Sequence, residues 1–158
     1  MQRGNFIIAA LLVLAAVIYL IVSSTGNTAR YFLTIDELLA MGDDAIGRRI
    51  TVSGAVLGQT ILVDPDAPRV TFTIVHVPGD PQTVQRLGGL ASVLHQATMD
   101  PERARLQVVY DADPPDLLRD EAQAIVRGSL REDGQFHADE VLLKCPSRYA
   151  EDIPDQIE

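Results

Sequence analysis

The stretch GQFHADEVLLKCPSRY, residues 134–149, decides the fold, because a last strand runs straight into the only cysteine of the chain. Asp133-Gly134 is a hairpin-turn signal, and the apolar and β-favouring residues after it can pair back against the preceding strand. Pro146 lacks the N–H group that would continue a ladder, and it holds the residue before it extended. We therefore expect Cys145 where the sheet ends and an exposed tail begins, which is a good position for a reactive group.

Five more stretches have the composition of short strands. Residues 48–57 alternate strictly between two faces, and Gly54 within them indicates a bend or a bulge. In the last strand the apolar positions change face near Asp139-Glu140, which predicts another bulge there. The remaining predicted strands are 59–64, 70–77, 106–110 and 123–130.

Two short helices complete the predicted fold. Thr34 is an N-cap with Glu37 as its capping-box partner, and Gly42 ends this helix after about two turns. Residues 84–97 carry apolar side chains at helical spacing, although Gly88-Gly89 weakens that helix. Six short strands with a helix between the third and the fourth favour an all-β fold, a small six-stranded OB-fold-like barrel, over a sandwich.

The N-terminal segment carries no charge from Gly4 to Ala29, and Phe6 to Val22 is almost entirely apolar. At about 1.5 Å per residue this run can cross a hydrocarbon core of roughly 30 Å, so it predicts a single transmembrane helix. Arg3 is the only charge before the run and favours a cytoplasmic N-terminus with the domain outside. A cleaved signal peptide is the alternative, but the run exceeds the usual h-region and no A-x-A site follows it.

The predicted organisation is a cytoplasmic N-terminus (1–5), a transmembrane anchor (6–25), a linker (26–30), an OB-fold barrel (31–144) and a flexible C-terminal tail (145–158). After position 29 the chain holds all 22 acidic residues and 12 of the 13 lysines and arginines, a net charge of −10. A surface of that sign repels phosphate backbones, which argues against nucleic-acid binding. Whether the N-terminal segment is an anchor or a cleaved signal peptide, the domain is exported. A lone cysteine in it cannot close an internal disulfide.

The sequence lacks the common catalytic and metal-binding patterns. It has no serine elbow, no glycine-rich phosphate loop and no CxxC pair. His76, His95 and His137 lack the spacing of a protein metal site. We expect His76 at a strand end with a satisfied ring nitrogen, and His95 on the weak helix. A classical enzyme is therefore disfavoured.

Several segments, taken in order, resemble one known family. They are Leu33-Thr34, GRRITVSG (47–54), Phe72-Thr73, PDLLR (115–119), Gly128, Asp133-Gly134, and ADEVLLKC (138–145) with Tyr149. This order, with the C-x-x-x-Y ending, resembles the cytochrome c maturation protein E (CcmE) family, membrane-anchored haem chaperones whose soluble part is an OB-fold barrel with a mobile tail. The resemblance extends from the membrane helix to about Glu151.

The resemblance implies a haem chaperone at the periplasmic side of the inner membrane, which works with haem-delivery and haem-lyase membrane proteins and passes haem to apocytochrome c. Most of the family has a histidine at the position of Cys145, and this chain resembles the branch with cysteine there. The covalent role toward haem therefore carries over to Cys145, and the axial iron-ligand role to Tyr149. The segment from Asp80 to Arg103 is longer than the family's usual connection.

The chemistry of the tail agrees with that implied role. A thiolate can add to a haem vinyl group to give a thioether link, and a phenolate is an axial ligand that favours ferric haem. Lys144 and Arg148 are placed to pair with the haem propionates. Two alternatives stay open: a membrane-anchored OB-fold binding module without covalent haem chemistry, and a thiol redox partner that forms mixed disulfides through Cys145.

Overall fold

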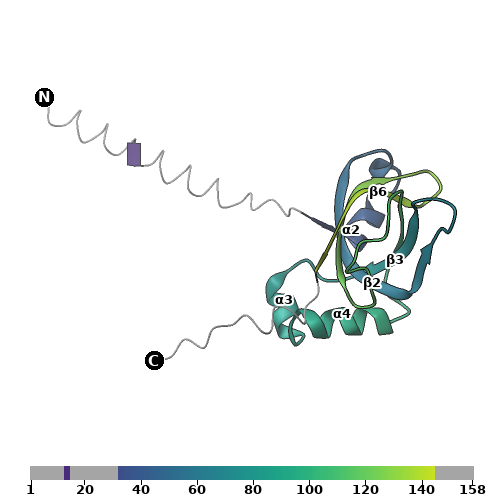
Figure 1. The fold of residues 1–158 in the computed structure, drawn as a ribbon. Coiled ribbons are helices and arrows are strands. Elements are labelled where there is room, and N and C mark those ends of the chain that lie inside the picture. The colour runs from purple at the N-terminus through teal and green to yellow at the C-terminus, as the bar shows by residue number, and fades with distance from the viewer. Residues whose placement is uncertain (1–12, 15–31, 145–158) are drawn as a thin grey trace, which may run out of the picture. The chain divides into compact units, whose positions relative to one another are not determined.

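The computed structural model of the chain describes residues 13–14 and 32–144 (Figure 1). The strands in this part are β1 (Leu33–Thr34), β2 (Ile50–Val63), β3 (Val70–His76), β4 (Arg105–Tyr110), β5 (Gln123–Leu130) and β6 (Phe136–Lys144). The helices are α2 (Ile35–Ala40), the 3-10 turn η1 (Gly42–Ala45), α3 (Pro81–Arg86) and α4 (Gly89–Met99).

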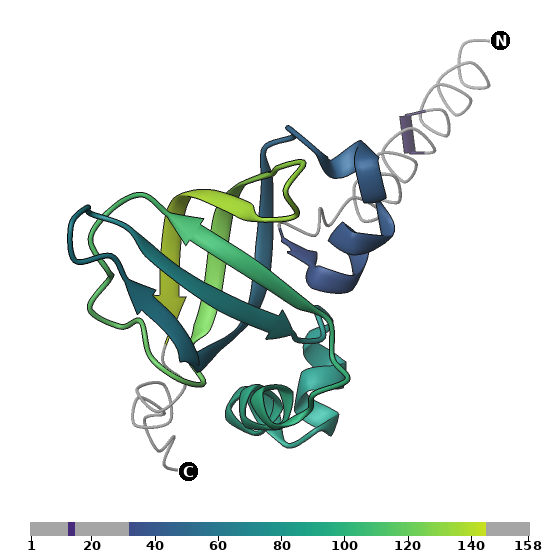
Figure 2. The ribbon, with the colours of Figure 1, turned by 90° about the vertical axis from the view of Figure 1, so that its right-hand side faces the viewer.

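Strands β2 to β6 close into a small barrel (Figure 2). The sheet order is β1-β2-β3-β4-β6-β5, and an antiparallel ladder between β5 and β2 joins its two sides. Neighbouring barrel strands are antiparallel except for β4 and β6, which run parallel. A closed barrel of five strands, in which the parallel pairing joins β4 to β6, has the architecture of an OB fold. The predicted all-β barrel is therefore confirmed.

The extent of β2 corrects the predicted strand boundaries. The prediction of separate strands over 48–57 and 59–64 is wrong, because β2 is one continuous strand of 14 residues. Its register against β3 shifts after Leu57, where the Thr60 hydroxyl donates to the Leu57 carbonyl at 2.6 Å and accepts from the Thr73 N–H at 2.9 Å. The Thr60 side chain thus replaces backbone bonds that the shift removes. The sixth strand is instead the two-residue β1, which pairs in parallel with β2.

Gly54 lies where β2 changes partners. It pairs with Ala124 of β5 on one side and with His76 of β3 on the other. A Cβ atom at this position would lie 2.9 Å from the carbonyl oxygen of Val75. The register is regular at Gly54, so the prediction of a bulge there is wrong. Glycine is needed because the backbone of β3 approaches too closely for a side chain.

The bulge predicted near Asp139-Glu140 is confirmed. Arg127 of β5 pairs with Glu140, but its neighbour Gly128 pairs two residues earlier on β6, so Asp139 is the extra residue. A Cβ atom added to Gly128 would overlap the carbonyl oxygen of His137. The bulge therefore depends on the absence of a side chain at position 128.

The barrel interior holds the larger apolar cluster. Phe72 and Phe136 are completely buried in it, together with Leu38 of α2. Helix α2 begins with the predicted capping box, since the Glu37 N–H donates to Thr34 Oγ1 at 3.3 Å and the Thr34 N–H donates to Glu37 Oε2 at 2.9 Å. Local capping and burial in the barrel therefore agree on where this helix starts.

The predicted single helix over 84–97 is wrong, because the segment forms two helices, α3 and α4 (Figure 1). Gly88 and Gly89 have φ values of +93° and +87°, a left-handed conformation that breaks the helix and that glycine adopts without strain. The predicted packing of the segment on the barrel is confirmed by α4. The residues that α4 buries against the outer face of β2 and β3 are Val93, Leu94 and Ala97.

An ion pair ties the residue before β3 to the residue after β4, with Arg69 Nε 2.6 Å from Asp111 Oδ1. The hydrogen bond from Arg69 lowers the pKa of the Asp111 carboxyl below its usual value. Because the folded pKa is the lower one, the pair stabilises the fold above the unfolded pKa of about 3.9, and this contribution is lost as pH falls through the folded pKa.

We therefore expect Arg69→Ala to raise the Asp111 pKa, as followed by NMR titration of the carboxyl carbon. Arg69→Ala should have a lower free energy of unfolding than the wild type at neutral pH, and this difference should be absent in strong acid. The exposed pair Arg49 and Asp139 serves as the control, because Arg49→Ala removes an equivalent charge and leaves Asp111 untouched. An Asp111 pKa equal in both variants and the wild type contradicts this account.

Two predicted segments fall largely outside the described residues. Of the predicted anchor, 6–25, the structure describes Val13 and Leu14. Within residues 13–14 and 32–144, no helix combines the length and apolar character that a membrane crossing requires. The predicted tail, 145–158, also lies outside the described part of the chain.

Candidate functional site

The end of β6 fixes the point from which the predicted binding tail starts. Its last residue, Lys144, is exposed and pairs with Gln123, the first residue of β5. Among the predicted site residues the structure describes Lys144, whereas Cys145, Arg148 and Tyr149 lie outside the described residues. Covalent geometry alone puts the Cα atom of Cys145 about 3.8 Å beyond that of Lys144.

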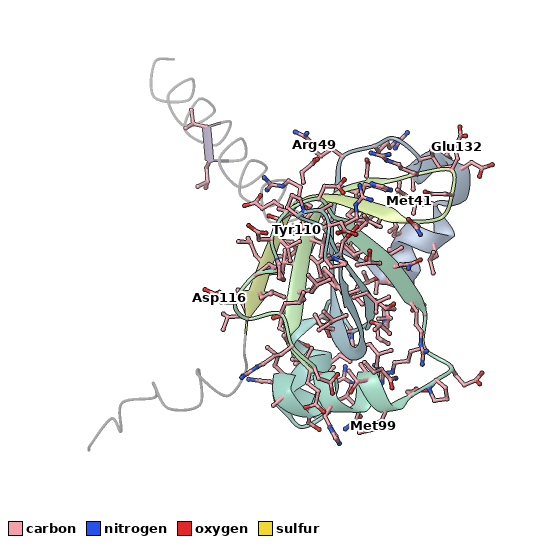
Figure 3. All side chains as sticks on the ribbon, turned by 45° about the vertical axis from the view of Figure 1, so that its right-hand side comes forward. Met41, Arg49, Met99, Tyr110, Asp116 and Glu132 are labelled. Atoms are coloured by element: carbon pink, nitrogen blue, oxygen red, sulfur yellow. The ribbon has the colours of Figure 1, made fainter. Side chains whose placement is uncertain are left out.

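The second half of β6 has an edge that β4 does not cover. β4 ends at Tyr110, so its pairing with β6 stops at Ala138. From Asp139 to Lys144 this edge runs beside the connection between β4 and β5, residues 111–122 (Figures 2 and 3). We call the segment 139–144 together with the connection 111–122 the β6 edge.

The connection 111–122 is anchored to β2 by hydrogen bonds. The Val56 N–H donates to the Ala122 carbonyl at 2.9 Å, and the Glu121 N–H donates to the Val56 carbonyl at 3.0 Å. The Gly58 N–H donates to Asp120 Oδ1 at 2.7 Å. A Cβ atom on Gly58 would lie 2.5 Å from that of Asp120, so glycine permits this close contact. The β6 edge is therefore a fixed part of the barrel.

Apolar side chains line the β6 edge. Those that pack against the barrel core and remain half-buried are Tyr110, Leu118, Val141 and Leu143. Leu117, beside Leu118, is 39% exposed. Figure 3 shows Tyr110 and Asp116 on the side of the barrel where β6 runs. A flat apolar molecule that packs here would bury apolar surface next to the start of the tail.

The carboxylates of β6 have cationic neighbours. Asp139 Oδ2 lies 3.2 Å from Arg49 Nη2, and Glu140 Oε2 lies 3.3 Å from Arg127 Nη1. Both pairs are exposed and add little stability, but they offset negative charge at this edge. Lys144 forms no ion pair with another described residue, so in this part of the chain its ammonium group is available to an anion.

Two histidines have buried ring nitrogens without a hydrogen bond to described residues. His76 Nδ1 lies at an ion-pair distance of 3.4 Å from Asp36 Oδ2, but it makes no hydrogen bond of the kind that a satisfied ring nitrogen requires. Both ring nitrogens of His137 are unpartnered, and Nε2 lies 3.9 Å from Asp133 Oδ2. Residues 13–14 and 32–144 contain no group of three side chains that could hold a metal ion.

A titratable pair that the sequence analysis missed joins α4 to the β6 edge. His95 Nδ1 lies 2.6 Å from Glu121 Oε1. The prediction places His95 on a helix, and α4 does carry it. The partner lies 26 positions away, on a connection without a periodic pattern, so no local sequence signal relates the two residues.

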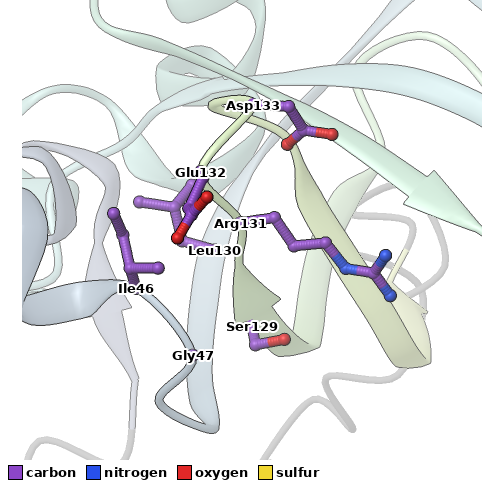
Figure 4. A pocket seen from close by; sticks show the side chains of 7 residues that line it. All are labelled: Ile46, Gly47, Ser129, Leu130, Arg131, Glu132 and Asp133. Atoms are coloured by element: carbon purple, nitrogen blue, oxygen red, sulfur yellow. The ribbon is translucent and has the colours of Figure 1, made fainter.

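A shallow hollow of about 430 Å³ lies at the other end of β5 and β6 (Figure 4). Its lining residues are Ile46, Gly47, Ser129, Leu130, Arg131, Glu132 and Asp133. These residues surround the hairpin at which β5 ends and β6 begins. Lys144 stands at the opposite end of β6, so this hollow is separate from the start of the tail.

The chain is similar to proteins of one known family. A family model described as the CcmE domain matches residues 29–152. The cytochrome c-type biogenesis protein CcmE of Sphingopyxis alaskensis is 30% identical over 148 residues, covering 94% of this chain and 84% of the relative. The protein of the same name from Azoarcus sp. is 31% identical over 140 residues, covering 89% and 76%.

A solved structure is also similar, the OB-fold domain of the heme chaperone CcmE from Desulfovibrio vulgaris. It is 19% identical in sequence, the match covers 63% of this chain and 90% of that one, and the TM-score is 0.41. The family match is the finding that decides membership, because it spans every strand of the barrel and continues past Cys145 and Tyr149. The chain therefore belongs to the CcmE family.

Proposed function

We propose that this chain is a membrane-anchored haem chaperone of cytochrome c maturation, which holds haem covalently through Cys145 and delivers it to apocytochrome c. The observation that carries the proposal is the end of β6. The strand stops at an exposed Lys144, beside half-buried apolar side chains, directly before the only cysteine. Relatives named for cytochrome c-type biogenesis support the same assignment.

The bond assigned to Cys145 is a thioether, and its formation balances without an oxidant. The thiol adds across the double bond of a haem vinyl group, so sulfur bonds to one vinyl carbon and the proton goes to the other. The thiolate is the attacking form, and a cationic neighbour such as Lys144 favours it. Release reverses the addition, because loss of that proton restores the vinyl double bond and the thiol leaves.

Side chains of the β6 edge and the other predicted site residues position the bound haem. The apolar face of the macrocycle rests on Leu118, Val141 and Leu143 of the β6 edge, where burial of apolar area favours binding. The phenolate of Tyr149 ligates the iron, and a phenolate ligand favours the ferric state. Lys144 and Arg148 pair with the propionates through charge-assisted hydrogen bonds. The edge of the macrocycle that points away from the barrel stays open, which transfer to an acceptor requires.

The proposal includes a location and partners. The apolar segment 6–25 anchors the chain in the inner membrane, with the barrel on the periplasmic side. Haem-delivery and haem-lyase membrane proteins of the maturation system act before and after the loaded state. The acidic barrel, with a net charge of −10 after position 29, disfavours nucleic acid as a partner.

Intact mass measurement of the full chain tests the proposal most directly. The chain is co-expressed with the rest of a maturation system in haem-replete cells, purified and weighed. We expect a species heavier by one haem, and haem that stays on the chain in denaturing electrophoresis. Reductant must leave this species unchanged, because a thioether resists thiols and a mixed disulfide does not. Bare polypeptide alone, or an adduct that reductant removes, overturns the proposal.

Replacing Tyr149 with phenylalanine should separate iron ligation from covalent attachment. The substitution removes the phenolate oxygen and keeps the ring, so we expect the ferric charge-transfer bands of phenolate ligation to disappear while haem stays covalently bound. Absorption and resonance Raman spectra of the loaded chain measure this. Tyr110→Phe is the matched control and should retain those bands. Identical ferric spectra for wild type and Tyr149→Phe contradict the assigned ligand.

A further inference from the structure

His95 and Glu121 form a hydrogen-bonded dyad whose outer nitrogen faces an open position. His95 Nδ1 and Glu121 Oε1 are 2.6 Å apart. An ionised carboxylate can only accept, so this hydrogen bond selects the neutral tautomer with its proton on Nδ1, in which Nε2 carries the lone pair. The His95 side chain is 57% exposed, and no described residue hydrogen-bonds to Nε2. The dyad thus presents a nitrogen ligand to its surroundings.

The backbone at Glu121 is held in an unusual conformation. Glu121 has φ of +59°, and among the described residues it is the non-glycine residue with positive φ. Its N–H donates to the Val56 carbonyl at 3.0 Å, and the preceding Asp120 binds the Gly58 N–H. Strained backbone of this kind costs free energy and is concentrated at functional sites. From this backbone position Glu121 Oε1 contacts His95 of α4.

The dyad lies close to the residue from which the tail starts. Gln123 and Lys144 are directly paired, so their Cα atoms are at most about 5.5 Å apart. Glu121 precedes Gln123 by two residues, which span at most about 7 Å. The Cα atoms of Glu121 and Lys144 therefore lie within about 13 Å of each other. Figures 1 and 2 both show α3 and α4 at the end of the barrel where β6 stops.

We propose that His95 Nε2 is the second axial ligand of the haem iron, on the face opposite Tyr149, while haem is held at Cys145. This inference rests on the proposed function. A carboxylate that accepts from the distal ring nitrogen fixes the tautomer and orientation of a histidine ligand and raises its basicity. Glu121 would do this for His95, and the pair would cover the iron face that the tail leaves open.

Stability alone is a weak reason for the dyad. An exposed hydrogen-bonded pair of side chains contributes little to folding. Helix α4 is already attached to the barrel by Val93, Leu94 and Ala97, which are buried against β2 and β3. His95→Ala should therefore leave the fold intact, which makes it a clean test of ligation.

Pulsed EPR of the ferric, haem-loaded full chain tests the ligand directly. The chain has three histidines, so labelling histidine with ¹⁵N separates their nitrogens from the porphyrin nitrogens. We expect a strong ¹⁵N coupling to iron in the wild type, its complete loss in His95→Ala and its retention in the control His137→Ala. Added imidazole should bind the loaded His95→Ala chain at least tenfold more tightly than the wild type, because the axial position is vacant.

Each outcome separates this inference from the proposed function. If haem is covalently bound but the wild type lacks the coupling, or His95→Ala retains it, the His95 ligand is overturned and the haem chaperone stands. If the wild-type chain carries no covalent haem, both are overturned.

Glu121→Gln supplies an independent measurement of the carboxylate's role. Glutamine at this position accepts a weaker hydrogen bond, so we expect the ¹⁵N coupling to remain and the midpoint potential of the iron to rise. The potential rises because a less basic imidazole stabilises the ferric state less. A merely structural dyad would leave the potential unchanged, and that result overturns the positioning role of Glu121.

Discussion

Cys145→Ala is expected to abolish the haem that stays attached to the chain during denaturing electrophoresis. The chain has one cysteine, so alanine at this position removes the only thiol that can form a thioether. The loss should be complete, because covalent attachment is all-or-none for each molecule. In-gel peroxidase staining and intact mass of the chain purified from cells with the full maturation system measure it.

Two substitutions at the same position show which property of the thiol matters. Cys145→Ser keeps the size of the side chain but replaces the thiolate with a poorly nucleophilic hydroxyl, so it should fail like alanine. Cys145→His introduces a nucleophilic imidazole, which the resemblance implies for most of the family at this position, and it should restore attachment. Haem that survives denaturation in Cys145→Ala shows that another residue forms the bond and overturns this assignment.

Gly128→Ala is expected to be the most destabilising small substitution in the barrel. A Cβ atom at position 128 would overlap the carbonyl oxygen of His137, which is backbone and cannot rotate away. Relief of this overlap requires the β5–β6 ladder to separate at the Asp139 bulge. We expect a loss of roughly 3 kcal/mol in the free energy of unfolding, from urea unfolding followed by circular dichroism.

Gly134→Ala distinguishes steric overlap from backbone conformation. Gly134 has φ of +78°, and a Cβ atom there meets nothing within 4 Å. Alanine at this position should cost only about 1 kcal/mol, the price of a left-handed backbone for a residue with a side chain. Equal effects of the two substitutions contradict the overlap as the cause.

Local signals predicted the parts of the fold that depend on neighbouring residues. Thr34 and Glu37 are three positions apart, and their reciprocal hydrogen bonds form within one turn. The change of apolar parity in the last strand predicted a bulge near Asp139-Glu140, where the structure has it, because successive strand residues face opposite sides. The resemblance to CcmE, carried by ordered motifs, predicted the family that the comparisons show.

Contacts between distant residues explain the predictions that were wrong. Two strands were predicted over 48–57 and 59–64, but β2 is continuous there, and the side chains of Thr60 and Asp120 supply hydrogen bonds at this point. One helix was predicted over 84–97, since helix propensity alone lets Gly88-Gly89 weaken a helix without ending it. Their positive φ values instead turn the chain so that α4 lies on the outer face of β2 and β3.

The sequence by itself determined the strand-forming segments, the capped helix, the bulge and the place of Cys145 directly after the last strand. These features depend on side-chain alternation, turn residues and proline, all of which act within a few positions. Only the tertiary structure decided which edge of β6 is uncovered, which apolar side chains line it, and that Glu121 meets His95. Those arrangements depend on barrel closure, which brings residues tens of positions apart into contact and leaves no local pattern in the chain.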